Sequence, residues 1–94
     1  MDLAKLQRDH WAWVESVGWH NKTPLECLAL IAGEIGEAAN ECRGERPTAE
    51  FPGELADIVL RVADLAHDQD IDLEAEIEAR MHRNHRTGRM GRLK

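Results

Sequence analysis

The sequence offers few residues that could hold a small fold together through covalent or zinc cross-links. Its 94 residues include only two cysteines, Cys27 and Cys42, which stand fifteen positions apart in an apolar helical pattern. No CxxC pair and no Cys/His spacing typical of a zinc site occurs. This argues against a disulfide framework or a structural zinc, and it favours two reduced core cysteines in a cytoplasmic protein.

Long apolar runs and strand patterns are also missing. The longest apolar run, Leu28 to Ala32, is far shorter than the roughly 20 residues that a membrane-spanning helix needs, and no secretory segment is visible. The β-branched residues are scattered, and the apolar residues recur at helical spacing. We therefore expect a single all-α domain over residues 1–94 that has no membrane partner.

Acidic residues are absent from the end of the chain. Residues 80–94 contain six basic residues and no acid, whereas residues 1–79 contain all 18 acids and the other six of the 12 bases. The body therefore carries a charge of −12 within a total net charge of −6. Such a division suits a protein that binds a cation and an anion together. We expect the basic tail over residues 87–94 to be flexible.

What the chain does contain is four stretches with helical spacing. The second has the clearest start, because Thr23 followed by Pro24 and Glu26 predicts a capping box with proline in the first turn. The expected helices run from Asp2 to Val17, from Thr23 to about Cys42 or Arg43, from near Pro52 to about His67, and from Asp72 to about His85. The apolar stripe of the second helix comprises Leu25, Leu28, Ile31, Ala32, Ile35, Ala39 and Cys42. Four helices of this length leave apolar surface uncovered, so we expect a compact bundle completed by dimerisation, as a homodimer or a dimer of dimers.

A row of acids follows one face of the second predicted helix. Glu34, Glu37 and Glu41 stand at i, i+3 and i+7, turned away from the apolar stripe. A solvated acidic face is one explanation. However, Glu37 and Glu41 repel each other at i, i+4, and no lysine or arginine stands at a compensating position from Glu34 or Glu37. The pattern therefore favours a bound cation.

The third predicted helix repeats this arrangement less clearly. Glu54 and Asp57 stand at i, i+3, and Arg61 and Asp64 follow on the same face. Surface ion pairs of Arg61 with Asp57 or Glu54, worth about 0.3–0.5 kcal/mol, would explain this stripe equally well. Taken alone, it predicts no site.

Together the two stripes predict a metal site. A short loop joins the two helices, so they should pack as an antiparallel hairpin and bring four carboxylates together. These are Glu34, Glu37, Glu54 and Asp57. Without a cation they would raise one another's pKa values. A set of oxygen ligands without His or Cys suits Mg²⁺, or Mn²⁺ in its place, rather than zinc, and the chain lacks the Glu-x-x-His motifs of di-iron bundles.

These motifs carry a resemblance to a known family. Glu34-x-x-Glu37, followed after sixteen residues by Glu54-x-x-Asp57, resembles the ExxE…ExxD signature of the all-α NTP pyrophosphohydrolases. This superfamily includes MazG-like proteins, dCTP pyrophosphatases and dimeric dUTPases. The segments "LALIAGEIGEAANECRG" and "ELADIVLRVADLAHDQDIDLEAEI" look like its second and third helices, and "RMHRNH" looks like its K-M-x-x-N close. The similarity covers residues 20–86.

The resemblance implies a MazG-like helical fold and an Mg²⁺-dependent reaction. A (d)NTP and water would give the (d)NMP and pyrophosphate, as in house-cleaning of nucleotide pools. Carried over by position, the metal ligands and catalytic residues would be Glu34, Glu37, Glu54 and Asp57. One of them, Glu37 or Glu34, would also orient the attacking water. Asp64 resembles an acid of phage-type MazG-like proteins and would be an outer ligand.

Substrate contacts are predicted on two other segments. By the same resemblance, Arg80, where relatives often have Lys, and Asn84 would bind phosphate or sugar oxygens. The alternative for Arg80 is a basic helix end that complements the helix dipole. Trp19 and His20 are the candidates for a base pocket, since indoles stack on nucleobases. The alternative is that the tryptophans fill the core or a subunit interface.

Two other functions are consistent with the composition. A catalytically silent helical module could serve in regulation, although all four acids are intact. A nucleic-acid binder could use the basic tail, but the acidic body would oppose it and no helix-turn-helix pattern is present. We therefore expect an enzyme and no nucleic-acid partner.

Overall fold

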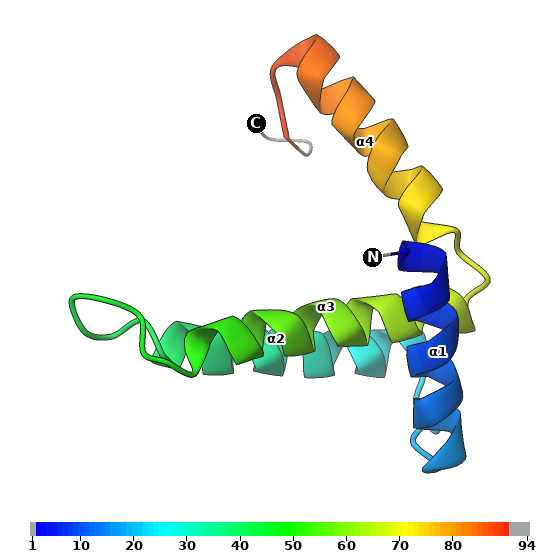
Figure 1. Cartoon of the computed structure of the whole chain (residues 1–94), viewed down its shortest axis with the longest axis horizontal. Coiled ribbons are helices and arrows are strands. Elements are labelled where there is room, and N and C mark those ends of the chain that lie inside the picture. Colours follow the sequence, from blue (N-terminus) through cyan, green and yellow to red (C-terminus); the bar gives the residue numbers. More distant parts are fainter. Residues whose placement is uncertain (1, 91–94) are drawn as a thin grey trace.

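The computed structural model describes residues 2–90, and over this range it contains four helices and no strand (Figure 1). Helix α1 spans Leu3–Ser16, α2 Pro24–Asn40, α3 Phe51–Asp68 and α4 Leu73–Thr87. The predicted all-α class and the number of helices are confirmed. Helix α2 ends slightly earlier than predicted and α4 slightly later, so Thr87 is helical rather than part of the tail. The last part of the predicted tail, 91–94, lies outside the described residues.

Local capping begins three of the four helices. The carboxylate of Asp2 accepts a hydrogen bond from the backbone of Lys5, and that of Asp72 accepts one from Ala75. Helix α2 has the predicted capping box: Thr23 and Glu26 each accept a backbone N–H from the other, at 3.2 and 3.0 Å. These starts depend on residues three positions apart, which is why the sequence predicts them well.

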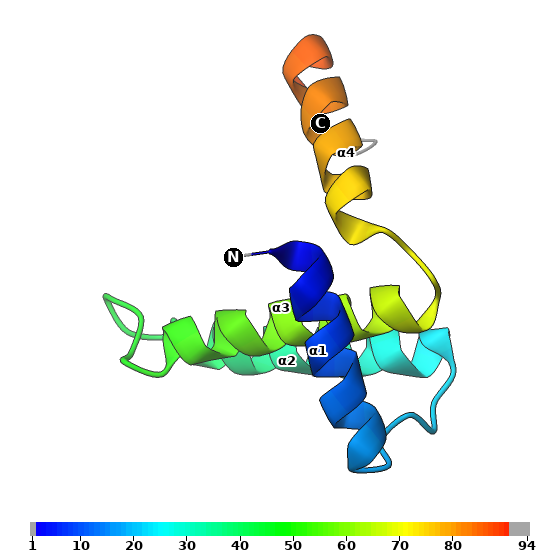
Figure 2. The same ribbon diagram turned by 45° about the vertical axis from the view of Figure 1, so that its right-hand side comes forward.

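Helices α2 and α3 lie side by side as the predicted hairpin, and α1 crosses them (Figures 1 and 2). The core is small and lies around this crossing. Its buried apolar residues are Val14, Ile31, Ala38, Ala63 and Ala66. The alanines of α3 allow the helices to approach closely.

Helix α4 stands away from the hairpin. It contacts α1 and α3 but not α2, and it contributes no buried residue. Its anchor is Gln7 of α1, whose Nε2 donates to the carbonyl of Ile71 at 3.0 Å and whose Oε1 accepts the N–H of Leu73 at 3.3 Å. The radius of gyration is 15.1 Å, whereas a compact domain of this length has about 12 Å. The single chain is therefore less compact than the predicted bundle, because among the described residues α4 packs only against α1 and α3 and buries none of its own side chains. The expected completion by a second copy stays a prediction.

The outer face of the hairpin is apolar and exposed. Of the predicted stripe on α2, only Ile31 is buried, while Leu25 and Leu28 are more than half exposed. The expectation of two core cysteines is also wrong, because Cys27 is half-buried and Cys42 is exposed. Both results follow from the rotation of α2, which turns part of its apolar stripe away from α3. None of the described helices is long and apolar enough to cross a membrane.

Candidate metal centre

Three of the predicted ligands converge where the middle of α2 faces the first turns of α3. Glu34, Glu54 and Asp57 each offer a carboxylate oxygen, and these oxygens all lie within 4.8 Å of one another. Glu34 and Glu54 are half-buried and Asp57 is exposed. The antiparallel hairpin produces this meeting, since Glu34 comes from the first motif and the other two from the second. Carboxylate oxygens are hard ligands of the kind that Mg²⁺ prefers, and three of them leave further coordination positions for water or phosphate.

Glu54 lies at the least favourable position for a charge. Its Oε2 atom is buried and has no hydrogen-bond partner among residues 2–90. Burial raises the pKa of Glu54 above its ordinary value, and the nearby Glu37, Asp57 and Glu34 raise it further. A divalent cation would supply the missing partner and remove the repulsion, so the residues present fit such an ion.

Glu37 lies beside this group rather than in it. Its side chain is exposed, and it is close enough to Glu54 to raise the pKa of that residue. Glu41, the third acid of the predicted stripe, accepts a hydrogen bond from the hydroxyl of Thr48 and so holds the α2–α3 loop. The structure thus brings Glu34, Glu54 and Asp57 together, leaves Glu37 adjacent, and uses Glu41 elsewhere.

Arg61 belongs to the site, but the sequence did not predict its ion-pair partner. Its Nε lies 2.7 Å from Glu34 Oε1, across the hairpin, whereas the sequence suggested pairs within α3. The Glu34 side chain is 13% exposed and that of Arg61 is 44% exposed. Among the described residues, no other lysine or arginine forms an ion pair with the clustered acids. The signal available in the sequence was the position of Arg61, one helical turn after Asp57.

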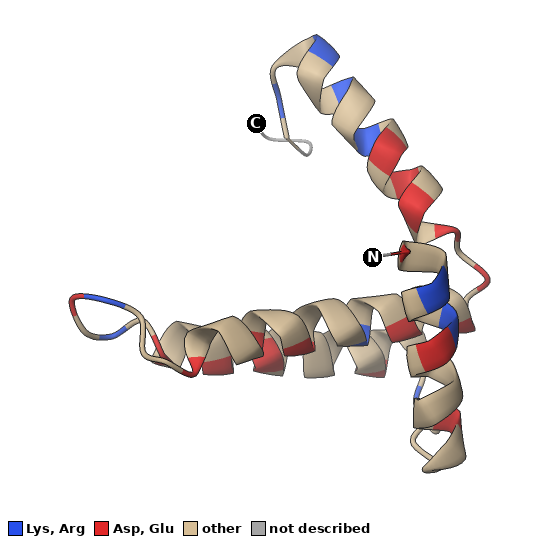
Figure 3. Ribbon diagram, viewed as in Figure 1, with Lys and Arg blue, Asp and Glu red and all other residues tan. Residues whose placement is uncertain are grey.

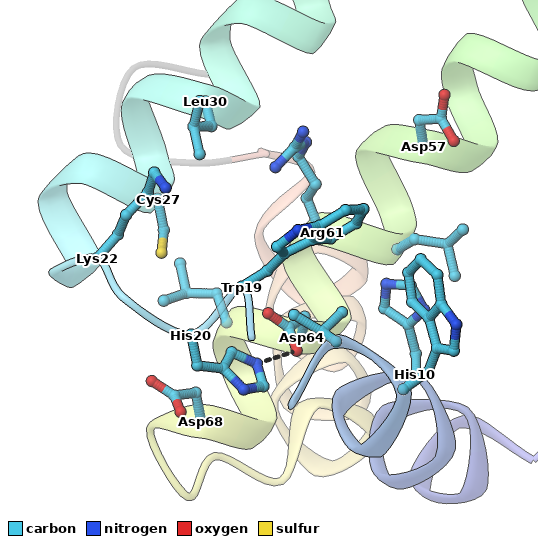
Figure 4. A pocket seen from close by; sticks show the side chains of 14 residues that line it. His10, Trp19, His20, Lys22, Cys27, Leu30, Asp57, Arg61, Asp64 and Asp68 are labelled. Atoms are coloured by element: carbon cyan, nitrogen blue, oxygen red, sulfur yellow. Dashed lines mark hydrogen bonds and ion pairs between the residues drawn. The ribbon is translucent and has the colours of Figure 1, made fainter. Parts of the chain in front are cut away.

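A cavity of about 570 Å³ opens next to the carboxylates (Figure 4). It lies between α1, the α1–α2 loop, α2 and α3. Asp57 of the carboxylate group lines it, and so does Arg61, the ion-pair partner of Glu34. Trp13 and Trp19 line it and meet edge to face at a centroid distance of 5.3 Å. Both are more than half exposed, so neither fills the core. The predicted pair Trp19 and His20 therefore lines a cavity that adjoins the acids.

His20 holds the cavity wall together. Its Nε2 lies 2.8 Å from Asp64 Oδ1 and its Nδ1 lies 2.6 Å from Glu15 Oε1, while Trp11 stacks on the ring at 4.8 Å. Burial lowers the pKa of His20, but the hydrogen bonds to Asp64 and Glu15 outweigh it, so the net pKa is raised. Asp64, predicted as an outer ligand, faces His20 and is not in the group of converging acids (Figure 4).

The remaining predicted substrate residues lie elsewhere in the chain. Arg80 and Asn84 are on α4, which makes no contact with α2, so one chain does not bring them to the carboxylates. Figure 3 shows the basic end of α4 well separated from the acids of the hairpin. Asn84 Oδ1 accepts a hydrogen bond from Arg83 at 3.4 Å. Comparisons of the chain with family models, curated proteins and solved structures found no match.

Proposed function

We propose that this protein is a Mg²⁺-dependent pyrophosphohydrolase of the MazG-like type. It would convert a (d)NTP and water into the (d)NMP and pyrophosphate, as a cytoplasmic enzyme that cleans nucleotide pools. The observation that carries the proposal is the convergence of Glu34, Glu54 and Asp57, because Glu54 also has a buried carboxylate oxygen without a hydrogen-bond partner among the described residues. Such an arrangement is costly unless a cation completes it.

The carboxylates that would hold the ion are Glu34, Glu54 and Asp57. Mg²⁺, or Mn²⁺ in its place, supplies positive charge to the triphosphate oxygens and lowers the pKa of water. Glu37 is the residue that we assign to orient the attacking water and accept its proton. It is adjacent to the cluster yet exposed, and Glu34, the other candidate, is bonded to Arg61. Attack at the α-phosphorus releases pyrophosphate as the leaving group.

The cavity would receive the nucleobase. Its volume of about 570 Å³ lies within the range of about 300–1,000 Å³ found for small-molecule sites. The exposed indoles of Trp13 and Trp19 offer faces for stacking, which contributes about 1–3 kcal/mol per base. His20, held by Glu15 and Asp64, would set the polar edge of the pocket.

We also propose that the active form is a homodimer or a dimer of dimers. Leu25, Leu28 and Ile35 of α2 and Leu55 and Val59 of α3 are exposed on the hairpin. In such an assembly α4 would reach a second copy, and Arg80 and Asn84 would bind phosphate or sugar oxygens there. The assembly would thereby bring Arg80 and Asn84 to the substrate, which the single chain does not do.

The decisive experiment is a screen for pyrophosphate release. Canonical and damaged NTPs and dNTPs are incubated with Mg²⁺, and pyrophosphate and phosphate are detected separately. We expect pyrophosphate from at least one nucleotide, and we expect Glu54→Gln to lower kcat at least about 100-fold, because a ligand oxygen becomes an amide. Glu50→Gln is the matched control, since Glu50 precedes α3 and its side chain makes no capping hydrogen bond. Release of free phosphate with a nucleoside diphosphate, or full activity of Glu54→Gln, would contradict the proposal.

A further inference from the structure

Arg61 stands between the metal centre and the cavity. It belongs to α3 and lines the cavity, as Asp57 does (Figure 4). Its side chain also reaches across to Glu34 on α2. Its guanidinium is bonded to Glu34 through Nε only, and within the described part of the chain its two terminal nitrogens donate no hydrogen bond. A guanidinium with free N–H groups beside a cavity is suited to bind an oxyanion in a bidentate manner.

We infer that Arg61 is a substrate-binding residue, and that its ion pair with Glu34 keeps it from the substrate until a cation is bound. Without a cation, Arg61 is the counterion of the acidic cluster. When a divalent cation is bound, Glu34 turns to it, and the released guanidinium of Arg61 binds phosphate oxygens of the nucleotide in the cavity. This inference rests on the proposed function, because it names the residue that couples cation binding to nucleotide binding at the same site.

The ion pair has the features of an exchangeable contact. Glu34 is one of the three converging acids, so its carboxylate would have to serve both the guanidinium and the cation. The Arg61 side chain is 44% exposed, and ion pairs with such exposure contribute little to stability. A doubly charged ion would therefore displace the guanidinium from Glu34 at low cost.

Among the described residues, no other lysine or arginine is as well placed to bind the phosphates. Lys22 also lines the cavity, but its Nζ donates to Asn21 at 2.8 Å, at the start of α2 and on the opposite side from Asp57 (Figure 4). Arg80 is on α4, which does not contact α2. A nucleotide with its base against Trp19 and its phosphates at the carboxylates would pass Arg61, because Arg61 lines the cavity and also contacts the cluster.

A purely structural role makes the opposite prediction. If Arg61 only ties α2 to α3, its loss would loosen the hairpin and weaken cation binding, and it would leave nucleotide contacts unchanged. If Arg61 competes with the cation for Glu34, its loss would tighten cation binding and weaken nucleotide binding. The two directions can be measured without turnover.

The test uses the full chain and two binding titrations. Calorimetry with Mn²⁺ alone gives the cation affinity. Tryptophan fluorescence gives the nucleotide affinity, in saturating Mg²⁺, with the α,β-imido analogue of the best NTP, in which the bond that the enzyme would break is replaced. Fluorescence is suitable because Trp13 and Trp19 line the cavity. We expect Arg61→Gln to bind Mn²⁺ about fivefold more tightly and the analogue at least about tenfold more weakly. Arg61→Lys should regain part of the analogue affinity, and Arg46→Gln, on the α2–α3 loop, should behave as wild type.

The outcomes separate this inference from the proposed function. Equal or weaker Mn²⁺ binding by Arg61→Gln, or unchanged analogue binding, would overturn the role of Arg61 and leave the metal centre standing. Failure of the wild-type protein to bind Mn²⁺ would overturn both. Circular dichroism of each variant shows that it is folded, and Arg61→Lys provides the comparison if Arg61→Gln is not.

Discussion

At the scale of single residues, two carboxylates from different helices share one histidine. Both ring nitrogens of His20 face an acid, Asp64 from α3 and Glu15 from α1, and the ring stacks on Trp11. Trp11 itself donates to Asp68 at 3.1 Å and packs near His67. Only the protonated imidazole donates to both acids at once. The hydrogen bonds that link α1 to α3 through His20 at the cavity wall therefore depend on the charge of His20.

This arrangement predicts a dependence of stability on pH. The net pKa of His20 is raised above its ordinary 6.5 in the folded protein. The contribution of protonated His20 to the free energy of unfolding is therefore fully present below about pH 6.5. It is lost as the pH rises through the raised pKa of His20 in the folded protein. We expect urea unfolding to show a larger loss of stability between about pH 6 and about pH 9 in wild type than in His20→Gln. His82→Gln, which changes an exposed histidine, is the control and should lose as much stability as wild type. Equal losses of stability in wild type and His20→Gln would contradict the role assigned to His20.

At the scale of elements, the junction between α3 and α4 depends on one buried polar side chain. Gln7 is 4% exposed and satisfies the backbone of both Ile71 and Leu73. Between these helices Asp70 has a φ of 56°, in the left-handed region, so the turn is tight. The side chain of Gln7 therefore sets where α4 leaves the body.

Removing this contact should destabilise the chain. Gln7→Ala leaves the part-buried carbonyl of Ile71 and the part-buried N–H of Leu73 without their partner, and losing the partner of such groups costs up to about 1–3 kcal/mol. We expect the midpoint of urea unfolding to fall accordingly. Gln69→Ala is the matched control, because Gln69 is exposed and, among the described residues, its side chain bonds only to its neighbour Asp68, at 3.4 Å. A loss no larger than that of the control would show that the junction is held by other contacts.

At the scale of the whole molecule, the chain exposes more surface than its size accounts for. Its accessible area is 7353 Å², whereas a compact monomer of this mass has about 5,500 Å². Exposed large apolar side chains lie on the outer hairpin and on α4. Stable homodimers bury about 2,000 Å² or more in total. An interface with a second copy of the chain would therefore be large enough to bury the excess accessible area.

We expect light scattering to give a homodimer, or twice that mass, at micromolar concentration and physiological salt. Leu28→Glu places a charge in the middle of the exposed α2 stripe, where Leu28 is 53% exposed, and should produce monomers with reduced stability. Met90→Glu adds the same charge to an exposed apolar residue outside the helices and should leave the mass unchanged. A monomeric wild type would contradict the proposal.

Much of the fold was predictable because its causes are local. The capping box of Thr23 and Glu26 and the cap at Asp72 act within one helical turn, and both predicted starts are confirmed. The position of α4 was not predictable in this way. It depends on Gln7, which is 66 positions from Leu73 and has no feature in the sequence that marks it as a clamp.

The spacing of the two acidic motifs likewise predicted that carboxylates would meet, because a helical hairpin makes residues at that separation neighbours. Which carboxylates meet depended on how each helix is rotated about its axis. Glu34 and Glu37 differ by about 60° around the helix, and packing against α3 turns Glu34 inward and leaves Glu37 exposed. The same packing places the guanidinium of Arg61 against the carboxylate of Glu34. Rotation is set by contacts summed over both helices, so it appears only in the tertiary structure.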